Sequence, residues 1–180
     1  MELLKKFFKK MTLKSYLIYT AVILAGIVLD QLTKLLAVLY LEPISDVPLW
    51  DGVFHLHYHE NTGAAFGMMA DARWVFMLFS TVAILLFGVY LFSGNIQNRL
   101  TGVSMALVIS GGIGNMIDRI GAGYVVDFLY FKLINFAIFN VADAIVCIGA
   151  GLLVLAVLLE LIDETRKKKA GTDGEDKTDA

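Results

Sequence analysis

Residues 111–143 read GGIGNMIDRIGAGYVVDFLYFKLINFAIFNVAD, and this stretch decides the fold. It joins two apolar segments that are each long enough to cross a bilayer, yet it carries several polar and ionisable side chains. An ionisable group near a membrane core costs at least about 2.5 kcal/mol, so a chain that keeps several there is expected to use them. The polar residues of the stretch include Asn115, Asp118, Arg119, Asp127, Asn140 and Asp143.

The composition places the chain in a membrane. Of its 180 residues, 58% are apolar and 18% are charged, and the mean hydropathy is +0.71, well above that of a typical soluble domain. A net charge of -2 leaves no basic stripe to displace counterions from phosphate, which argues against a nucleic-acid partner. The single cysteine, Cys147, lies in an apolar run and is expected to be a buried hydrophobe.

Hydropathy predicts an all-α membrane protein with four transmembrane helices and a small extracytoplasmic β-rich cradle and loop. The spans are expected at about residues 16–40, 73–93, 101–120 and 140–162, each near the roughly 20 residues that a bilayer core requires. They form a single domain, residues 16–163. The loops at 41–72 and 121–139 contain runs rich in β-branched and aromatic residues, Val53 to Tyr58 and Tyr124 to Phe131, which predict strands.

Positive charges predict the orientation of the spans. Five lysines precede the first span, Arg99 lies in the turn between the second and third, and Arg166 to Lys169 follow the fourth. Since such an excess marks the cytoplasmic side, both termini are expected in the cytoplasm. Residues 1–15 are typical of a basic amphipathic segment on the leaflet surface. Residues 164–180 are expected to be basic and then, from Ala170, a disordered tail.

Two polar motifs precede the third span. Asp30, Thr33 and Lys34 lie on one helix face near the outer end of the first span. They fit a supporting role in a site, and equally an interfacial ion pair in which Lys34 snorkels to water. Asn61 and Gly63 form an Asn-x-Gly turn signal. The small residues around this turn would also let an extended substrate peptide approach the backbone.

Three histidines, His55, His57 and His59, alternate in sequence, so that a strand would point all of them to one side. That is a possible metal site, but three ligands on one strand are a poor tetrahedral set, and Glu60 would be out of phase with them. We therefore expect neither a metal nor another cofactor.

The third span carries both packing and polar residues. Gly111 and Gly114 share a helix face and predict close packing against a neighbouring span. Asn115, Asp118 and Arg119 also share a face. Arg119 is expected to hold Asp118 ionised, which favours a structural ion pair over direct catalysis by that aspartate. The same arginine is also placed to hydrogen-bond substrate carbonyls.

Asp127 and Asp143 form the candidate catalytic pair. Asp127 has apolar neighbours on both sides, and burial would favour its protonated form, although an aspartate that turns to water is the simpler alternative. Asn140 is placed to cap the fourth span with Asp143 in the first turn, an arrangement that is structural in many helices. Because the helix dipole favours an ionised Asp143, the two carboxyl groups are suited to share one proton asymmetrically.

Five motifs in this order resemble the bacterial lipoprotein signal peptidases, also called signal peptidase II, over residues 16–162. The motifs are Asp30-x-x-Thr33-Lys34, Asn61-x-Gly63-Ala64-Ala65-Phe66, Gly111-Gly112-x-Gly114-Asn115-x-x-Asp118-Arg119, Val126-Asp127-Phe128 and Phe139-Asn140-x-Ala142-Asp143. The alternating histidines and the polar tail are not part of this pattern.

The resemblance implies an aspartic endopeptidase of the bacterial cytoplasmic (inner) membrane, with its active site near the outer leaflet. Such enzymes cut diacylglyceryl-modified prolipoproteins before the lipobox cysteine, and the cyclic peptide globomycin occupies their site as a substrate mimic. The implied catalytic pair is Asp127 and Asp143. The implied substrate-binding and supporting residues are Asn61, Gly63, Asn115, Asp118, Arg119, Asn140, Asp30 and Lys34. We expect a monomer that works in membrane lipid without a cofactor.

Three other classes fit parts of the sequence. A transporter would use the intramembrane charges as an ion path, although the sequence lacks a repeat of interrupted helices. A serine intramembrane protease would use Ser104 or Ser110, but no histidine lies near them in sequence. A non-enzymatic assembly subunit would need the packing glycines but not the paired carboxylates.

Overall fold

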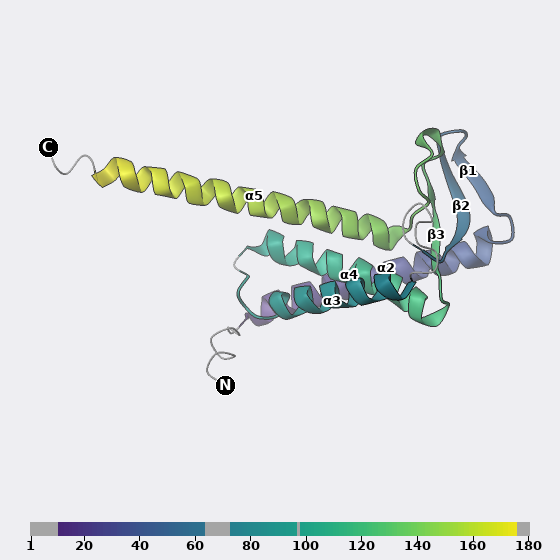
Figure 1. Ribbon diagram of the computed structural model, residues 1–180, viewed down its shortest axis with the longest axis horizontal. Helices are drawn as coiled ribbons and strands as arrows, with labels where there is room; N and C mark the ends of the chain where they lie inside the picture. The colour runs from purple at the N-terminus through teal and green to yellow at the C-terminus, as the bar shows by residue number, and fades with distance from the viewer. Residues whose placement is uncertain (1–10, 64–72, 97, 176–180) are drawn as a thin grey trace.

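The computed structural model describes residues 11–63, 73–96 and 98–175 (Figure 1). The helices are α2 (Leu13–Leu36), which continues into the π-helical turn η1 (Ala37–Leu41), α3 (Arg73–Leu91), α4 (Arg99–Gly121) and α5 (Val141–Glu175). The first part of α5 lies beside α2, α3 and α4, and a small sheet lies across one end of these helices. Side-chain caps begin α2 and α4: Thr12 accepts from the backbone N–H of Ser15, and Asn98 accepts from that of Leu100.

Three helices of the described chain are long and apolar enough to cross a membrane: Leu13–Leu41, Arg99–Gly121 and Val141–Lys167. The apolar part described for α3, Met77–Leu91, is shorter. Large apolar side chains such as Leu24 on α2, Leu78 on α3 and Val154 on α5 are exposed, as expected for surfaces that meet lipid. The helical membrane architecture with a small sheet is therefore confirmed.

Helix α4 packs closely against two neighbours because glycine lies at the contacts. A Cβ on Gly111 would lie 2.4 Å from the carbonyl oxygen of Ala142 at the start of α5, and one on Gly114 would lie 2.5 Å from Oδ2 of Asp30 on α2. Neither contact leaves room for a larger residue. The small-residue face predicted from the sequence thus brings the first turn of α5 and the acidic residue of α2 against the same helix.

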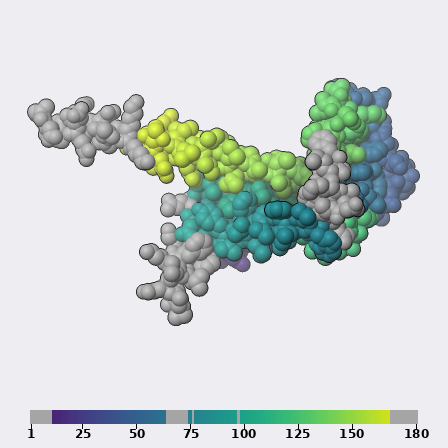
Figure 2. All heavy atoms as spheres, viewed as in Figure 1, coloured from purple at the N-terminus to yellow at the C-terminus, as the bar shows by residue number. Residues whose placement is uncertain are grey.

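The sheet is antiparallel, in the order β1 (Asp46–Trp50), β2 (Phe54–Asn61) and β3 (Val125–Tyr130). Both runs predicted as strands are therefore confirmed. An apolar cluster that includes Ala37, Leu41, Val126 and Phe128 joins one face of the sheet to the end of the first span. Figure 2 shows the sheet as a block at one end of the molecule. Because side chains alternate along β3, Asp127 points away from this cluster, toward the helices.

The expectations for the tail and for Cys147 are wrong. The tail does not leave the helical conformation at Ala170, because α5 continues to Glu175. Lys167 pairs with Asp163 at 2.6 Å, an i, i+4 contact that favours helix beyond the apolar segment. Cys147 is exposed rather than buried. Residues 1–10 of the predicted amphipathic segment, residues 64–72 of the first loop and residues 176–180 of the tail lie outside the described chain.

Candidate active site

Asp127 lies in the middle of β3 and is 1% exposed. Its two carboxyl oxygens accept hydrogen bonds from different elements. Oδ2 accepts from Nδ2 of Asn61 at the end of β2 (2.8 Å), and Oδ1 accepts from Nδ2 of Asn140 before α5 (2.6 Å). Burial nevertheless dominates and raises the pKa of Asp127 to about 7, with a further increase from the charge of Asp143. The alternative of a loop aspartate exposed to water is therefore wrong.

Asp143 lies in the first turn of α5, held by a reciprocal cap. The backbone N–H of Asp143 donates to Oδ1 of Asn140 (3.0 Å), and the backbone N–H of Asn140 donates to Oδ2 of Asp143 (3.1 Å). This is the capping box predicted from the sequence. The other carboxyl oxygen, Oδ1, accepts from Nδ2 of Asn115 on α4 at 2.7 Å.

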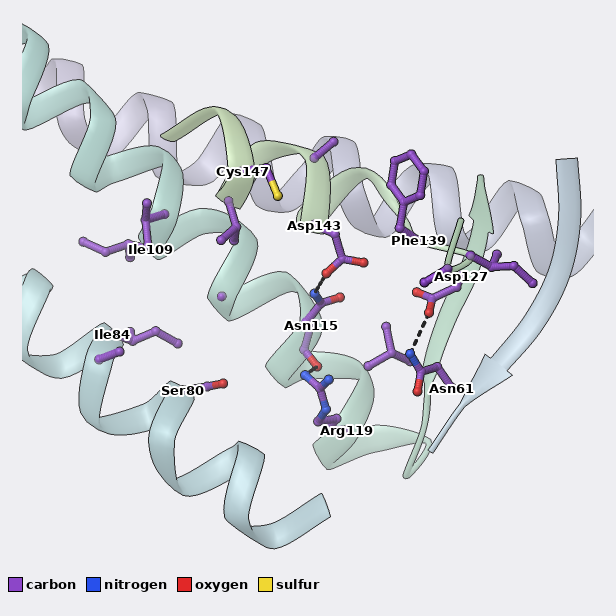
Figure 3. A pocket seen from close by; sticks show the side chains of 18 of the residues that line it. Asn61, Ser80, Ile84, Ile109, Asn115, Arg119, Asp127, Phe139, Asp143 and Cys147 are labelled. Atoms are coloured by element: carbon purple, nitrogen blue, oxygen red, sulfur yellow. Dashed lines mark hydrogen bonds between the residues drawn. The ribbon is translucent and has the colours of Figure 1, made fainter. Parts of the chain in front are cut away.

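The two aspartates face one cleft of about 580 Å³ (Figure 3). Asp143 enters from α5 and Asp127 from β3, with Arg119 of α4 beside them. The cleft is polar at this end and apolar where α3, α4 and α5 line it. Its apolar part includes Ala83, Ile84, Phe87, Val108, Ile109, Gly112, Val146 and Cys147.

Behind the aspartates lies a buried charge cluster centred on Lys34, which is 3% exposed. Its Nζ is 2.8 Å from carboxyl oxygens of both Asp30 and Asp118, and it donates to Oδ1 of Asn115 at 2.8 Å. Lys34 therefore does not snorkel to water. The remaining oxygen of Asp30 accepts from the backbone N–H of Ala142 at 2.9 Å, which ties α2 to the start of α5.

The expected pairing of Asp118 with Arg119 is wrong, because Asp118 pairs with Lys34. Neighbouring residues on a helix point about 100° apart, so Asp118 faces α2 while Arg119 faces the cleft. The guanidinium of Arg119 is 3.5 Å from the carbonyl oxygen of Asn115. It supplies positive charge beside the two aspartates from the wall of the cleft.

The Asn-x-Gly turn also joins the site. The backbone N–H of Gly63 donates to Oδ1 of Asn61 at 2.9 Å, which leaves the Nδ2 of that amide to face Asp127. The predicted turn therefore also orients the Asn61 amide so that its NH2 group donates to Asp127. All ten predicted site residues thus lie in or directly behind one polar network.

The histidines do not converge. Nδ1 of His55 and Nδ1 of His57 both contact the carboxylate of Asp46, at 2.9 and 3.1 Å, while His59 is exposed. A shift of the β2–β3 register between Leu56 and His59 interrupts the alternation. Among the described residues, no group of three or more His, Cys, Asp or Glu side chains is arranged so that it could hold a metal ion.

Sequence reasoning missed Gln31. Its Nε2 donates to Asp118 (2.9 Å) and to the carbonyl oxygen of Gly114 (3.2 Å), so it braces the charge cluster from α2. The available signal was a polar amide inside an apolar span.

The hydroxyl groups of the two serines of α4 donate to backbone carbonyls of the same helix: Ser104 donates to the carbonyl of Leu100 and Ser110 to that of Leu107.

Comparison with known proteins finds matches in both sequence and fold. Residues 22–159 match the family described as signal peptidase (SPase) II. The chain is 43% identical over 145 residues to the lipoprotein signal peptidase of Brevibacillus brevis, covering 81% of this chain and 95% of that one. It is 39% identical over 155 residues to the lipoprotein signal peptidase of Bacillus subtilis, covering 85% and 99%. A bacterial membrane enzyme solved at 1.9 Å resolution superposes with a TM-score of 0.71 and 27% identity, over 83% of this chain and 96% of that one.

Proposed function

Because this chain belongs to the signal peptidase II family, we propose that it is an aspartic endopeptidase that removes signal peptides from prolipoproteins, with Asp127 and Asp143 as its catalytic residues. The observation that carries the proposal is the pair itself. Two carboxyl groups from separate elements open into one cleft, and the same asparagine, Asn140, holds both.

The pair suits a shared-proton mechanism. Each aspartate accepts an N–H donor at both oxygens, but Asp143 also lies in the first turn of α5, where the helix dipole favours a carboxylate. Asp143 is therefore the group that takes a proton from a water molecule held between the two. Asp127, buried and with its raised pKa, carries the proton. It polarises the scissile carbonyl as the water oxygen attacks, and then protonates the amine that leaves when the C–N bond breaks. No metal or cofactor takes part.

The cleft suits a lipidated peptide. Its polar end holds the aspartates and Arg119, which is placed to donate to substrate backbone carbonyls. Its apolar part lies among three helices, where the apolar region of a signal peptide would find a matching surface. The substrate is a diacylglyceryl-modified prolipoprotein cut before its lipobox cysteine. The protein lies in the bacterial inner membrane with both termini in the cytoplasm and the aspartates near the outer leaflet.

The test is cleavage of a diacylglyceryl-modified precursor by the purified protein in detergent. Asp127→Asn and Asp143→Asn should each lose cleavage by at least about 10³-fold, while the exposed Asp51→Asn serves as a matched control that retains it. Globomycin should block the wild-type reaction. Near-wild-type cleavage by either active-site variant would overturn the assignment.

A further inference from the structure

Lys34 lies behind the cleft, outside the set of described residues that line it. It is nevertheless one contact from Asp143, because Asn115 stands between them. Nζ of Lys34 donates to Oδ1 of Asn115 (2.8 Å), and Nδ2 of Asn115 donates to Oδ1 of Asp143 (2.7 Å). The lysine is therefore placed to act on the site without touching substrate.

The chemistry of the ammonium group fixes the direction of this chain of hydrogen bonds. Lysine has three N–H donors and no acceptor, so only the oxygen of the Asn115 amide can face it. The NH2 group must then face Asp143. Asn140 reinforces this orientation, because its Nδ2 also donates to Oδ1 of Asn115, at 3.0 Å.

This orientation has a consequence for the proton that the two aspartates share. Asp143 meets a donor at both oxygens: Asn115 at Oδ1 and the backbone N–H of Asn140 at Oδ2. A protonated Asp143 could donate to Asn115 only if that amide turned over, and the turned amide would present its NH2 group to Lys34. The ammonium thus opposes protonation of Asp143 through the amide as well as through its charge.

We propose that Lys34 is a positioning residue that locks the Asn115 amide as a donor and so keeps the shared proton on Asp127. This rests on the proposed function of the pair. The other charged groups near Asp143 are Arg119 of α4 and Asp127 of β3, and Lys34 itself is paired with Asp30 and Asp118. A purely structural lysine would only hold these two acids together.

A positioning role and a purely structural role for Lys34 predict different pH profiles of cleavage. The enzyme with one shared proton is the active form, so binding of a second proton by the pair sets the acid limb of kcat/KM. Without Lys34 only Asn140 still holds the Asn115 amide as a donor, so the amide turns and accepts more readily. The acid limb should then move to higher pH by about one unit, a tenfold change in the apparent proton affinity. Loss of structure alone would reduce the folded fraction without moving the limb.

The experiment compares Lys34→Met/Asp118→Asn with Asp118→Asn. The double variant removes one positive and one negative charge, so it keeps the net charge of the cluster. We expect kcat to fall on the order of 10- to 100-fold with KM within about twofold, because Lys34 positions and does not bind. We also expect the acid limb to shift. Lys132→Met, at an exposed lysine, is the control for the chemical change and should keep the wild-type profile.

An unshifted acid limb in the folded double variant would overturn the role proposed for Lys34. Should that variant fail to fold in thermal unfolding assays, Lys34→Gln/Asp118→Asn leaves an amide in place of the ammonium and carries the same expectation and the same overturning result. Failure here is distinct from failure of the proposed function. If Asp127→Asn is inactive but the acid limb of the Lys34 variant does not shift, only the role of Lys34 is overturned. If Asp127→Asn is active, both the role of Lys34 and the proposed function are overturned.

Discussion

Asn140 Nδ2 lies 2.6 Å from Oδ1 of Asp127, so the residue that caps α5 also holds the carboxylate of β3. Asn140 is fully buried. A helix start and a strand centre are thereby fixed to each other by one side chain, and the separation of the two aspartates depends on it.

Replacing Asn140 should therefore lower stability and activity by more than the loss of a helix cap alone would. Asn140→Ala removes the capping acceptor, worth about 1 kcal/mol, and also leaves Asp127 without one donor. We expect a lower melting temperature and a loss of cleavage on the order of 100-fold. Asn98→Ala, which removes the cap of α4 at a distance from the aspartates, is the matched control. It should lower the melting temperature yet keep kcat, and equal losses of kcat in the two variants would contradict the dual role of Asn140.

Cleavage should have an alkaline limb near neutral pH. Asp127 must be protonated to act, and its pKa is about 7. Activity should therefore be highest below this value and fall about tenfold per unit above it. The measurement is kcat/KM between about pH 5 and 9 in one detergent. A profile that rises through pH 7 would assign the proton to another group.

A variant of Asn61 tests the pKa of Asp127 by removing a hydrogen bond that lowers it. The hydrogen bond from Asn61 lowers the pKa of Asp127 by favouring the carboxylate. Asn61→Leu should therefore move the alkaline limb to higher pH, even though overall activity falls. A limb that stays in place would show that this bond does not set the protonation of Asp127.

Helix packing makes a separate prediction about stability. Gly111→Ala places a methyl group against the backbone of Ala142, which cannot move aside as a flexible side chain would. We expect destabilisation of roughly 1–3 kcal/mol and reduced cleavage, since α5 carries Asp143. The control is Gly151→Ala in α5, where the new methyl group meets no atom of the described chain within 4 Å beyond its chain neighbours and the backbone of its own helix turn. That variant should be as stable as wild type or slightly more so, as measured by thermal unfolding in detergent.

Chelators should not affect the reaction. His55 and His57 each direct Nδ1 to Asp46, and the backbone N–H of Gly52 donates to Nε2 of His55. These hydrogen bonds explain how the two imidazole rings are held in place without a metal. Cleavage measured with and without EDTA should therefore be equal, and a loss that added zinc restores would contradict this interpretation.

Local sequence was enough to predict much of the architecture. Runs of about 20 apolar residues predict spans wherever they occur, and the cap formed by Asn140 and Asp143 depends on residues three positions apart. The strand around Asp127 follows from its β-branched and aromatic neighbours. The motif resemblance placed the ten site residues together, but it did not supply their contacts.

The features that follow from the amino-acid sequence alone are therefore local: where the helices and strands lie, how α5 begins, and which polar residues a bilayer would not tolerate without a use. The partners of these residues became known only from the folded molecule. It paired Asp118 with Lys34 rather than with the adjacent Arg119, exposed Cys147 and brought Gln31 into the cluster. The physical reason is that such pairings depend on how each helix is rotated against its neighbours, and that rotation results from packing between residues far apart in the chain.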